Sequence, residues 1–457
     1  MPIELAPDAV DRTLALLGEH DLATVEDVEV ALESMAARED EAEPIALSRY
    51  DLQLFLWHQL PRKFLAPLET KERIAAGLGR FLELAGGPAA KYAEICGSPD
   101  TRRLLRAWEG ADHEAAKMLQ GVLDASGIEP PDTDALEWGE AMGPEEARLH
   151  REVALALERA LEDGRLTLGE RGFPRRRAAL VLELVRSPRA ELDGRAPVDL
   201  VLEERLADWV RRGSEKRREL LAAVEQLLRD REPDASRAAD TDGPLEPLAW
   251  LLEMAVNGIT LTQTGALSRA LVRTAVERYP RWWRNDLFGP PQREDDVFSL
   301  RQVHGLARRT RLLRRRGRKL LLTRRGDELR EDGAALLEGC APRLLAADGF
   351  TAAVQELVAA VLLDRGRVDG REMELEVQRA ILAEGWHADG EPPRLEDVAG
   401  AASGLVALGD ALGLVHPEYE FDRETGRARR DLELTSDGRV GLRLALRARA
   451  VGPARML

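Results

Sequence analysis

The stretch RLLRRRGRKLLLTRRGDEL, residues 311–329, decides the fold predicted for the C-terminal half of this chain. Two short runs rich in leucine and arginine flank Gly317, and glycine favours the tight turn that joins two antiparallel strands. The second run ends in a leucine and Thr323, and Gly326 follows after two residues. The pattern predicts a β-hairpin that leads directly into a helix.

The same arrangement recurs near the end of the chain. The segment LVHPEYEFDRETGRARRDLELT, residues 414–435, predicts a second hairpin that turns at Glu424-Thr425-Gly426, and Gly438 repeats the Leu-Thr-x-x-Gly spacing. Apolar periodicity predicts helices around both hairpins. For the first hairpin they are 245–256, 265–280, 299–313 and 324–339, with a short strand at 259–262; for the second they are 351–366, 373–386, 395–414 and 438–450. A repeated order of elements is stronger evidence than a single occurrence.

This order and the Leu-Thr-x-x-Gly pattern after the hairpin resemble the winged-helix superfamily. The resemblance implies two tandem modules, a basic one at residues 244–345 and an acidic one at residues 346–457. It also implies that the helix before each hairpin is the one that faces DNA. We therefore expect a mainly α, multidomain helical protein with two winged-helix (α+β) modules at its C-terminus.

Charge is unevenly distributed along the chain, whose formal net charge is −16. Basic side chains outnumber acidic ones between residues 299 and 330, and phosphate binding depends on accumulated Lys and Arg. We expect double-stranded DNA to bind there. The candidate DNA-binding residues are Arg301, Gln302, Arg308, Arg309, Arg314, Arg315, Arg316, Arg318 and Lys319. The alternative is a solvated arginine-rich face that the acidic half of the chain neutralises.

The helix at 299–313 and the hairpin have different expected roles in DNA contact. Val303, Leu306 and Leu312 predict an inward apolar face, so the polar side chains of this helix project outward and read base edges. The hairpin arginines contact the phosphate backbone. In the acidic module, the corresponding helix carries Glu396 and Asp397, which repel phosphate. We expect that module to bind a protein partner, through those two residues, or to bind its sister module.

The N-terminal half is predicted to be helical. Its expected parts are an acidic domain at 1–150, a second helical module at 151–235 and a polar linker at 236–243. Residues 187–215, which contain LDGRAP, resemble an LDGRTP-type helical segment of bacterial accessory proteins, with Ala196 in place of the threonine. This resemblance implies no catalysis.

Sequence motifs of catalysis are missing. The chain has no phosphate-binding loop and no dinucleotide fingerprint, and its histidines are scattered. The segment DHEAAK begins like a zinc-protease helix, but Lys117 stands where the second histidine is required. Cys96 and Cys340 are expected to be small buried hydrophobic residues. We therefore expect a non-enzymatic protein without cofactor or metal.

No apolar run approaches the length of a membrane span, and the N-terminus is acidic, so we expect no membrane contact and a cytoplasmic location. Two functions fit these features. The first is a regulator or nucleoprotein accessory factor that contacts DNA through the basic module. The second is an acidic protein-interaction scaffold, or a subunit of a larger complex, without direct DNA contact. Tandem winged helices also occur in acidic subunits that clamp partners of chromosome-organising ATPases. The sequence does not determine the oligomeric state.

Overall fold

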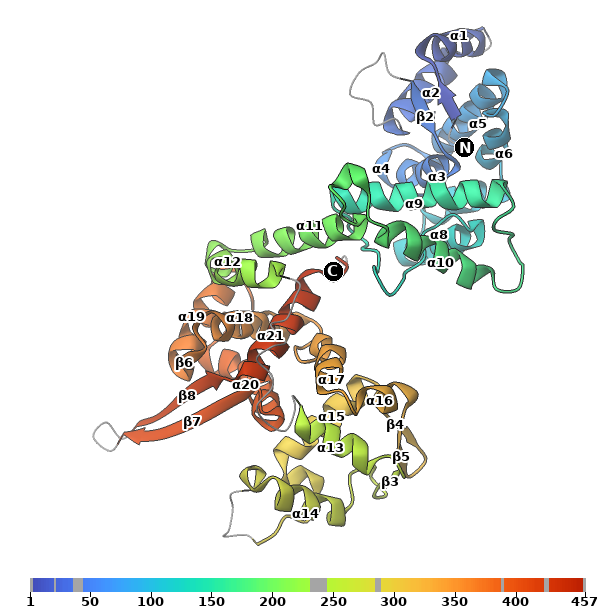
Figure 1. Cartoon of the computed structure of the whole chain (residues 1–457). Coiled ribbons are helices and arrows are strands. Elements are labelled where there is room, and N and C mark those ends of the chain that lie inside the picture. The colour runs from blue at the N-terminus through green and yellow to red at the C-terminus, as the bar shows by residue number, and fades with distance from the viewer. Residues whose placement is uncertain are drawn as a thin grey trace. The chain divides into compact units, whose positions relative to one another are not determined.

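A computed structural model describes residues 3–19, 22–35, 44–230, 245–283, 289–387, 390–422 and 427–454. The protein is mainly helical and contains small antiparallel sheets (Figure 1). Its contacts define two compact units, Met1–Val201 with Pro453–Leu457, and Leu202–Gly452. The mainly α fold class expected from the composition is confirmed.

The first unit consists of helices and a two-stranded sheet, in which β1 (Ile3–Leu5) pairs with β2 (Ile45–Leu47). Its helices are α1 (Pro7–Gly18), α2 (Leu22–Met35), α3 (Arg49–Leu54), the π-turn η1 (Phe55–Gln59), α4 (Leu60–Lys63), α5 (Leu68–Ala85), α6 (Ala90–Cys96), α7 (Pro99–Ala107), α8 (Asp112–Ser126), α9 (Pro144–Glu162), α10 (Phe173–Arg186), the 3₁₀ turn η2 (Ala190–Leu192) and the start of α11 (Pro197–Arg211). Phe55 and Phe81 are fully buried in its core, and Cys96 is a buried free cysteine.

The first C-terminal module, residues 245–345, has the order predicted from the sequence: helix, strand, helix, helix, hairpin, helix. Its elements are α13 (Glu246–Met254), β3 (Ile259–Thr260), α14 (Arg269–Arg278), η4 (Pro280–Trp282), η6 (Glu294–Asp296), α15 (Phe298–Arg309), β4 (Leu313–Arg316), β5 (Lys319–Leu322), α16 (Arg324–Leu329), α17 (Gly333–Cys340) and η7 (Ala341–Arg343). The strands form an antiparallel sheet in the order β3-β5-β4, so the predicted hairpin around Gly317 is confirmed.

The second C-terminal module, residues 349–452, repeats this order. Its elements are α18 (Gly349–Arg365), β6 (Arg367–Asp369), α19 (Gly370–Ala383), α20 (Leu395–Leu412), β7 (Val415–Asp422), β8 (Arg427–Leu434) and α21 (Ser436–Ala450). The sheet order is β6-β8-β7, which matches that of the first module strand for strand. The predicted turn at 424–426 lies outside the described residues. Strand β6 was not predicted, because three residues are too few for an alternating pattern and its pairing with β8 is a tertiary contact.

The Leu-Thr-x-x-Gly pattern has the same structural cause in both modules. Thr323 caps α16, because its hydroxyl oxygen accepts a hydrogen bond of 3.0 Å from the Gly326 amide. The same hydroxyl donates a hydrogen bond of 3.0 Å to the Leu312 carbonyl oxygen. Thr435 caps α21 in the same way through the Gly438 amide. Any side chain at either glycine would collide with a carbonyl oxygen of the turn before the hairpin. The pattern therefore joins the hairpin's two ends and starts the next helix.

Both modules and α12 (Glu215–Arg229) contribute to one hydrophobic core in the second unit. Leu221, Val224 and Leu228 of α12 are buried there, and α12 packs on α18, α19 and α21. The contact boundary between the units lies at Val201–Leu202, within α11. The sequence predicted a helical module at 151–235 but not which elements cover α12, and the linker expected at 236–243 lies outside the described part of the chain.

Candidate nucleic-acid interface

The hairpin of the first module has one apolar and one cationic face. Strand register places Leu313 opposite Leu322 on the face toward the core, where Leu313 and Leu320 are buried. Because side chains alternate along a strand, Arg314 and Arg316 project from the opposite face. Arg316 lies directly opposite Lys319. We call Arg314, Arg316 and Lys319 the basic hairpin face; all three are exposed.

Two like charges directly opposite each other on neighbouring strands destabilise a sheet. Among the described residues, no acidic side chain forms an ion pair with any member of the basic hairpin face. Positive charges farther along the chain are neutralised: Arg324 pairs with Glu328 at 2.7 Å, and Arg330 pairs with Glu253 at 2.7 Å and Asp327 at 2.9 Å. Arg308, Arg311 and Arg325 also form no ion pair among the described residues, so the basic hairpin face belongs to a larger region of uncompensated positive charge.

The second module also has a like-charged pair on its hairpin, but there a side chain of opposite charge in the same sheet contacts both members. The threonine that ends each hairpin aligns the two modules, and by register Glu418 and Asp431 correspond to Arg316 and Lys319. This pair is also of like charge, but Arg367 of β6 lies 2.8 Å from Glu418 and 3.2 Å from Asp431. Arg367 is opposite Glu433, which it also approaches to 3.6 Å. Arg429 also lies 2.8 Å from Asp431, so cations of the same sheet offset part of the negative charge on this face.

The first module has no side chain at the position of Arg367. By strand register, that position is Gly258, the residue before β3. Gly258 has a φ of 80°, and a Cβ there would lie 3.1 Å from Leu321 Cδ2, so a counter-ion from this position is sterically unfavourable. The basic hairpin face therefore has no neutralising partner in its own sheet and can accept an external anion.

Arg311 adds a further cation just before the hairpin. Its φ of 57° is in the left-handed region. The corresponding residue of the second module, Gly413, has a similar φ of 75°. A non-glycine residue in this conformation costs about 1–2 kcal/mol. Arg311 is exposed and, among the described residues, forms no ion pair. An arginine is therefore present where the backbone favours glycine.

The other predicted DNA-binding residues lie in different surroundings. Arg308 is exposed at the end of α15. Arg315 folds back so that its Nε donates to the Gly317 carbonyl oxygen at 2.9 Å, and Arg318 donates to the Leu261 carbonyl oxygen at 3.4 Å. Arg301 stacks over the Phe298 ring at 4.9 Å and lies 3.7 Å from Asp295. Arg301 therefore has an anionic neighbour already.

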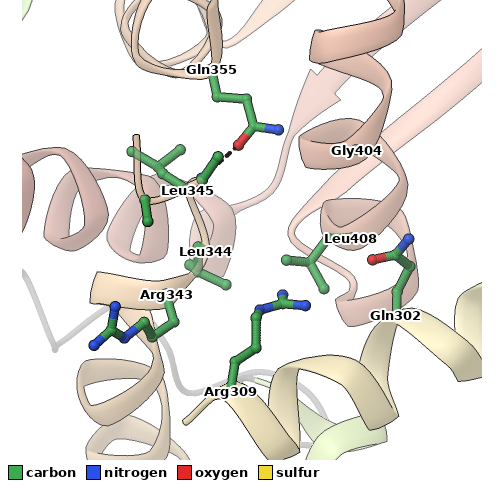
Figure 2. Close-up of a pocket in the computed structure, with 10 residues that line it drawn as sticks. Gln302, Arg309, Arg343, Leu344, Leu345, Gln355, Gly404 and Leu408 are labelled. Atoms are coloured by element: carbon green, nitrogen blue, oxygen red, sulfur yellow. Dashed lines mark hydrogen bonds between the residues drawn. The ribbon is translucent and has the colours of Figure 1, made fainter. Parts of the chain in front are cut away.

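Arg309 is exposed, as the sequence predicted, whereas Gln302 is only partly exposed, and both lie near the second module. Helix α15 packs against α20, the helix at the equivalent position of the second module. Figure 2 shows Gln302 and Arg309 beside Leu408 of α20, where they line a pocket. The face of α15 that carries them is thus turned toward the second module. The apolar periodicity of α15 could not reveal this, because it does not name the partner helix.

Glu396 and Asp397 both lie on the exposed first turn of α20. Asp397 has a structural role, because its Oδ2 accepts a hydrogen bond of 2.8 Å from the Arg394 amide. Negative charge in the first turn also interacts favourably with the helix dipole. Glu396 forms no such bond among the described residues, so of the two it is the more available for a partner.

Two buried polar networks were not found from the sequence. In the first unit, Tyr50 Oη lies 3.0 Å from His150 Nδ1, and Glu129 Oε1 lies 3.4 Å from His150 Nε2. Burial raises the pKa of Tyr50, and the negative charge of Glu129 raises it further. These side chains are far apart in the sequence, so no local motif indicated them. Their burial makes them a polar contact between α3, α9 and the chain after α8.

The second network lies in the first C-terminal module. His304 Nδ1 of α15 lies 2.7 Å from Glu294 Oε1, and Glu294 also accepts a hydrogen bond of 2.7 Å from the Leu267 amide. Burial opposes the ionised carboxylate, but the bonds from His304 and Leu267 outweigh it, so the pKa of Glu294 is lowered. This network fixes α15 to the chain segments before α14 and α15. Among the described residues, no group of three or more potential metal ligands occurs.

Comparison with known proteins gives one partial match. Residues 248–335 match the family model described as the Y4jL N-terminal domain, and this segment runs from α13 into α17 and includes the basic hairpin face. No curated protein and no solved structure matches the chain. In the part of the chain that the structure describes, no helix is long and apolar enough to cross a membrane.

Proposed function

We propose that this is a non-enzymatic cytoplasmic protein whose two C-terminal modules are tandem winged helices, and that its first module contacts double-stranded DNA. In this role it acts as a regulator or nucleoprotein accessory factor. The observation that carries the proposal is that Arg316 and Lys319 lie opposite each other and have no acidic partner among the described residues of their sheet. In the second module, the equivalent acidic pair has a partner of opposite charge, Arg367. DNA phosphates supply the missing negative charge at regular spacing.

The proposed contact is with the phosphate backbone and is independent of base sequence. Helix α15, which would read base edges in the major groove, packs against α20, and Gln302 and Arg309 face that contact. Arg301 is held near Asp295. The cations that are exposed and unpaired among the described residues are those of the hairpin, Arg311 and the arginines at the end of α15, and contacts of such cations with phosphates position a protein on DNA without specifying sequence.

A salt titration of the full-length protein with a short duplex tests this proposal. Each phosphate contact contributes about −0.9 to the slope of log K against log salt, so three contacts contribute about −2.7. Replacing the basic hairpin face by Arg314→Gln, Arg316→Gln and Lys319→Gln should remove most of that slope. Affinities for duplexes of different sequence should agree within about threefold, because each specific base contact would give about 1–3 kcal/mol of discrimination.

A matched control has the same change in net charge at a distant surface. Arg12, Arg80 and Arg103 of the first unit are exposed and lie on helices. Their replacement by glutamine should leave the slope unchanged if the hairpin is the site. Equal losses in both triple variants would show that only the net charge matters, and the proposed site would be abandoned.

The second candidate function is an acidic interaction scaffold without DNA contact. It is favoured by the net charge of −16 and by the packing of α15 against α20, which covers part of the expected reading surface. Under this alternative the basic hairpin face binds an acidic protein partner. Absence of duplex binding by the full-length protein at low salt, where electrostatic attraction is least screened, would favour it.

A further inference from the structure

A pocket of about 450 Å³ lies between α15, the chain that leads from η7 to α18, and α20. Leu344, Leu345 and Leu408 contribute apolar walls and are themselves buried (Figure 2). This volume is within the range of about 300–1,000 Å³ that is typical of small-molecule sites. The pocket lies away from the basic hairpin face, and no role described above uses it.

One cation points into this pocket. Figure 2 shows the Arg309 guanidinium between Leu344 and Leu408. Among the described residues it forms no ion pair and no side-chain hydrogen bond, and its partial burial lowers the pKa of Arg309. Arg309 is nevertheless exposed overall, and its positive charge has no carboxylate partner among the described residues. An anion bound in the pocket would supply that partner.

The surrounding residues make the pocket a preformed one. Gln355 of α18 fixes two walls, because its Oε1 accepts from the Ala346 amide at 2.8 Å and its Nε2 donates to the Ala401 carbonyl oxygen at 3.0 Å. Gln302 borders the pocket and has an amide group without a hydrogen bond among the described residues. It can therefore serve as a second donor beside Arg309.

We propose that this pocket binds a small apolar monocarboxylate. The carboxylate would pair with the planar guanidinium of Arg309, which matches two carboxylate oxygens. The apolar body would lie against Leu344 and Leu408. Phosphate groups fit less well, because the walls are leucines that would strip a strongly hydrated polyanion of its water.

A calorimetric titration of the full-length protein with octanoate tests the proposal. Octanamide has the same shape without the charge, so it should bind at least tenfold more weakly, since a charge-assisted pair is stronger than a neutral hydrogen bond. Replacing Arg309→Met should weaken octanoate binding at least tenfold. Arg343 is a control at the same pocket, because its side chain points away from the centre in Figure 2, and Arg343→Met should change the affinity less than twofold.

Equal affinities for octanoate and octanamide in the unaltered protein would overturn the proposal without recourse to any variant. Octanoate binding that Arg309→Met leaves unchanged would place the ligand elsewhere and would also overturn it. No binding at millimolar octanoate would show that the pocket does not select an apolar carboxylate. Circular dichroism of the Arg309→Met variant establishes that its fold is retained.

Discussion

At the scale of single residues, two positions show how the modules share a sequence pattern and yet differ in backbone preference. Thr323 and Thr435 make equivalent hydrogen bonds, so Leu-Thr-x-x-Gly is a signature of local structure. Arg311 and Gly413 occupy the same left-handed turn position, and only glycine is unstrained there. The residue that departs from the backbone preference is the one beside the basic hairpin face.

Replacing Arg311 with glycine should therefore stabilise the protein and weaken DNA binding. Relief of the left-handed strain, about 1–2 kcal/mol, exceeds the entropic cost of glycine, about 0.5–1 kcal/mol, so we expect a net gain of about 0.5–1 kcal/mol. Urea unfolding measures the gain. The reciprocal Gly413→Arg change should lower the free energy of unfolding; a neutral or opposite pair of effects would contradict the assignment of strain.

The glycine of the signature is equally testable. Gly438→Ala should destabilise the second unit by more than about 2 kcal/mol, because the added Cβ would collide with the Leu414 carbonyl oxygen and the backbone must shift. Gly400 of α20 is the control, since it is exposed and a Cβ there meets no atom. Gly400→Ala should stabilise by about 0.5–1 kcal/mol. Similar effects at the two sites would refute the steric explanation.

At the scale of elements, the two helices that precede the hairpins pack against each other. The sequence predicted the extents of α15 and α20 within a few residues, because their apolar periodicity is strong. Contact of the acidic module with its sister module was one of two expectations, but periodicity did not indicate that α15 and α20 are the contacting helices, nor that Asp397 caps its own helix. The hairpins were predictable because turn residues and alternating runs are local signals.

The capping role of Asp397 separates it from its neighbour Glu396. Asp397→Ala should lower the free energy of unfolding by about 1 kcal/mol, as loss of a helix cap does. Glu396→Ala should stay within about 0.5 kcal/mol, because surface substitutions without a specific contact have small effects. If urea unfolding shows that the two variants are equally destabilised, the hydrogen bond of Asp397 does not contribute to the free energy of unfolding beyond what an exposed side chain contributes.

Helix α15 also depends on the buried Glu294–His304 contact for its position. The pKa of Glu294 is lowered in the folded protein, so the stability it contributes is present above the usual carboxyl pKa and is lost as pH falls through the lowered value. Stability of the unaltered protein should therefore fall at acidic pH. In Glu294→Gln this part of the pH dependence should be absent, and an identical acid profile of the two proteins would contradict the expected linkage.

At the scale of the whole molecule, a chain with a net charge of −16 carries a local group of cations, unpaired among the described residues, at the hairpin of the first module. Arg324, Arg330 and Arg367 are all paired with carboxylates within their own modules. The uneven charge was visible in the sequence, but the distinction between paired and unpaired arginines required the strand register. The structure adds that Gln302 is only partly exposed and that Arg301 lies near Asp295, whereas Arg308 and Arg309 are exposed.

The most direct test of the central claim is to give the first hairpin the charges of the second. In the full-length variant Arg316→Glu and Lys319→Asp, the like-charged pair becomes acidic and repels phosphate. If the original pair neutralises two phosphates, the log–log salt slope for duplex binding should become shallower by about 1.8, and the affinity at low salt should fall for all sequences alike. A salt slope and affinity identical to those of the unaltered protein would contradict the assignment of this hairpin to DNA.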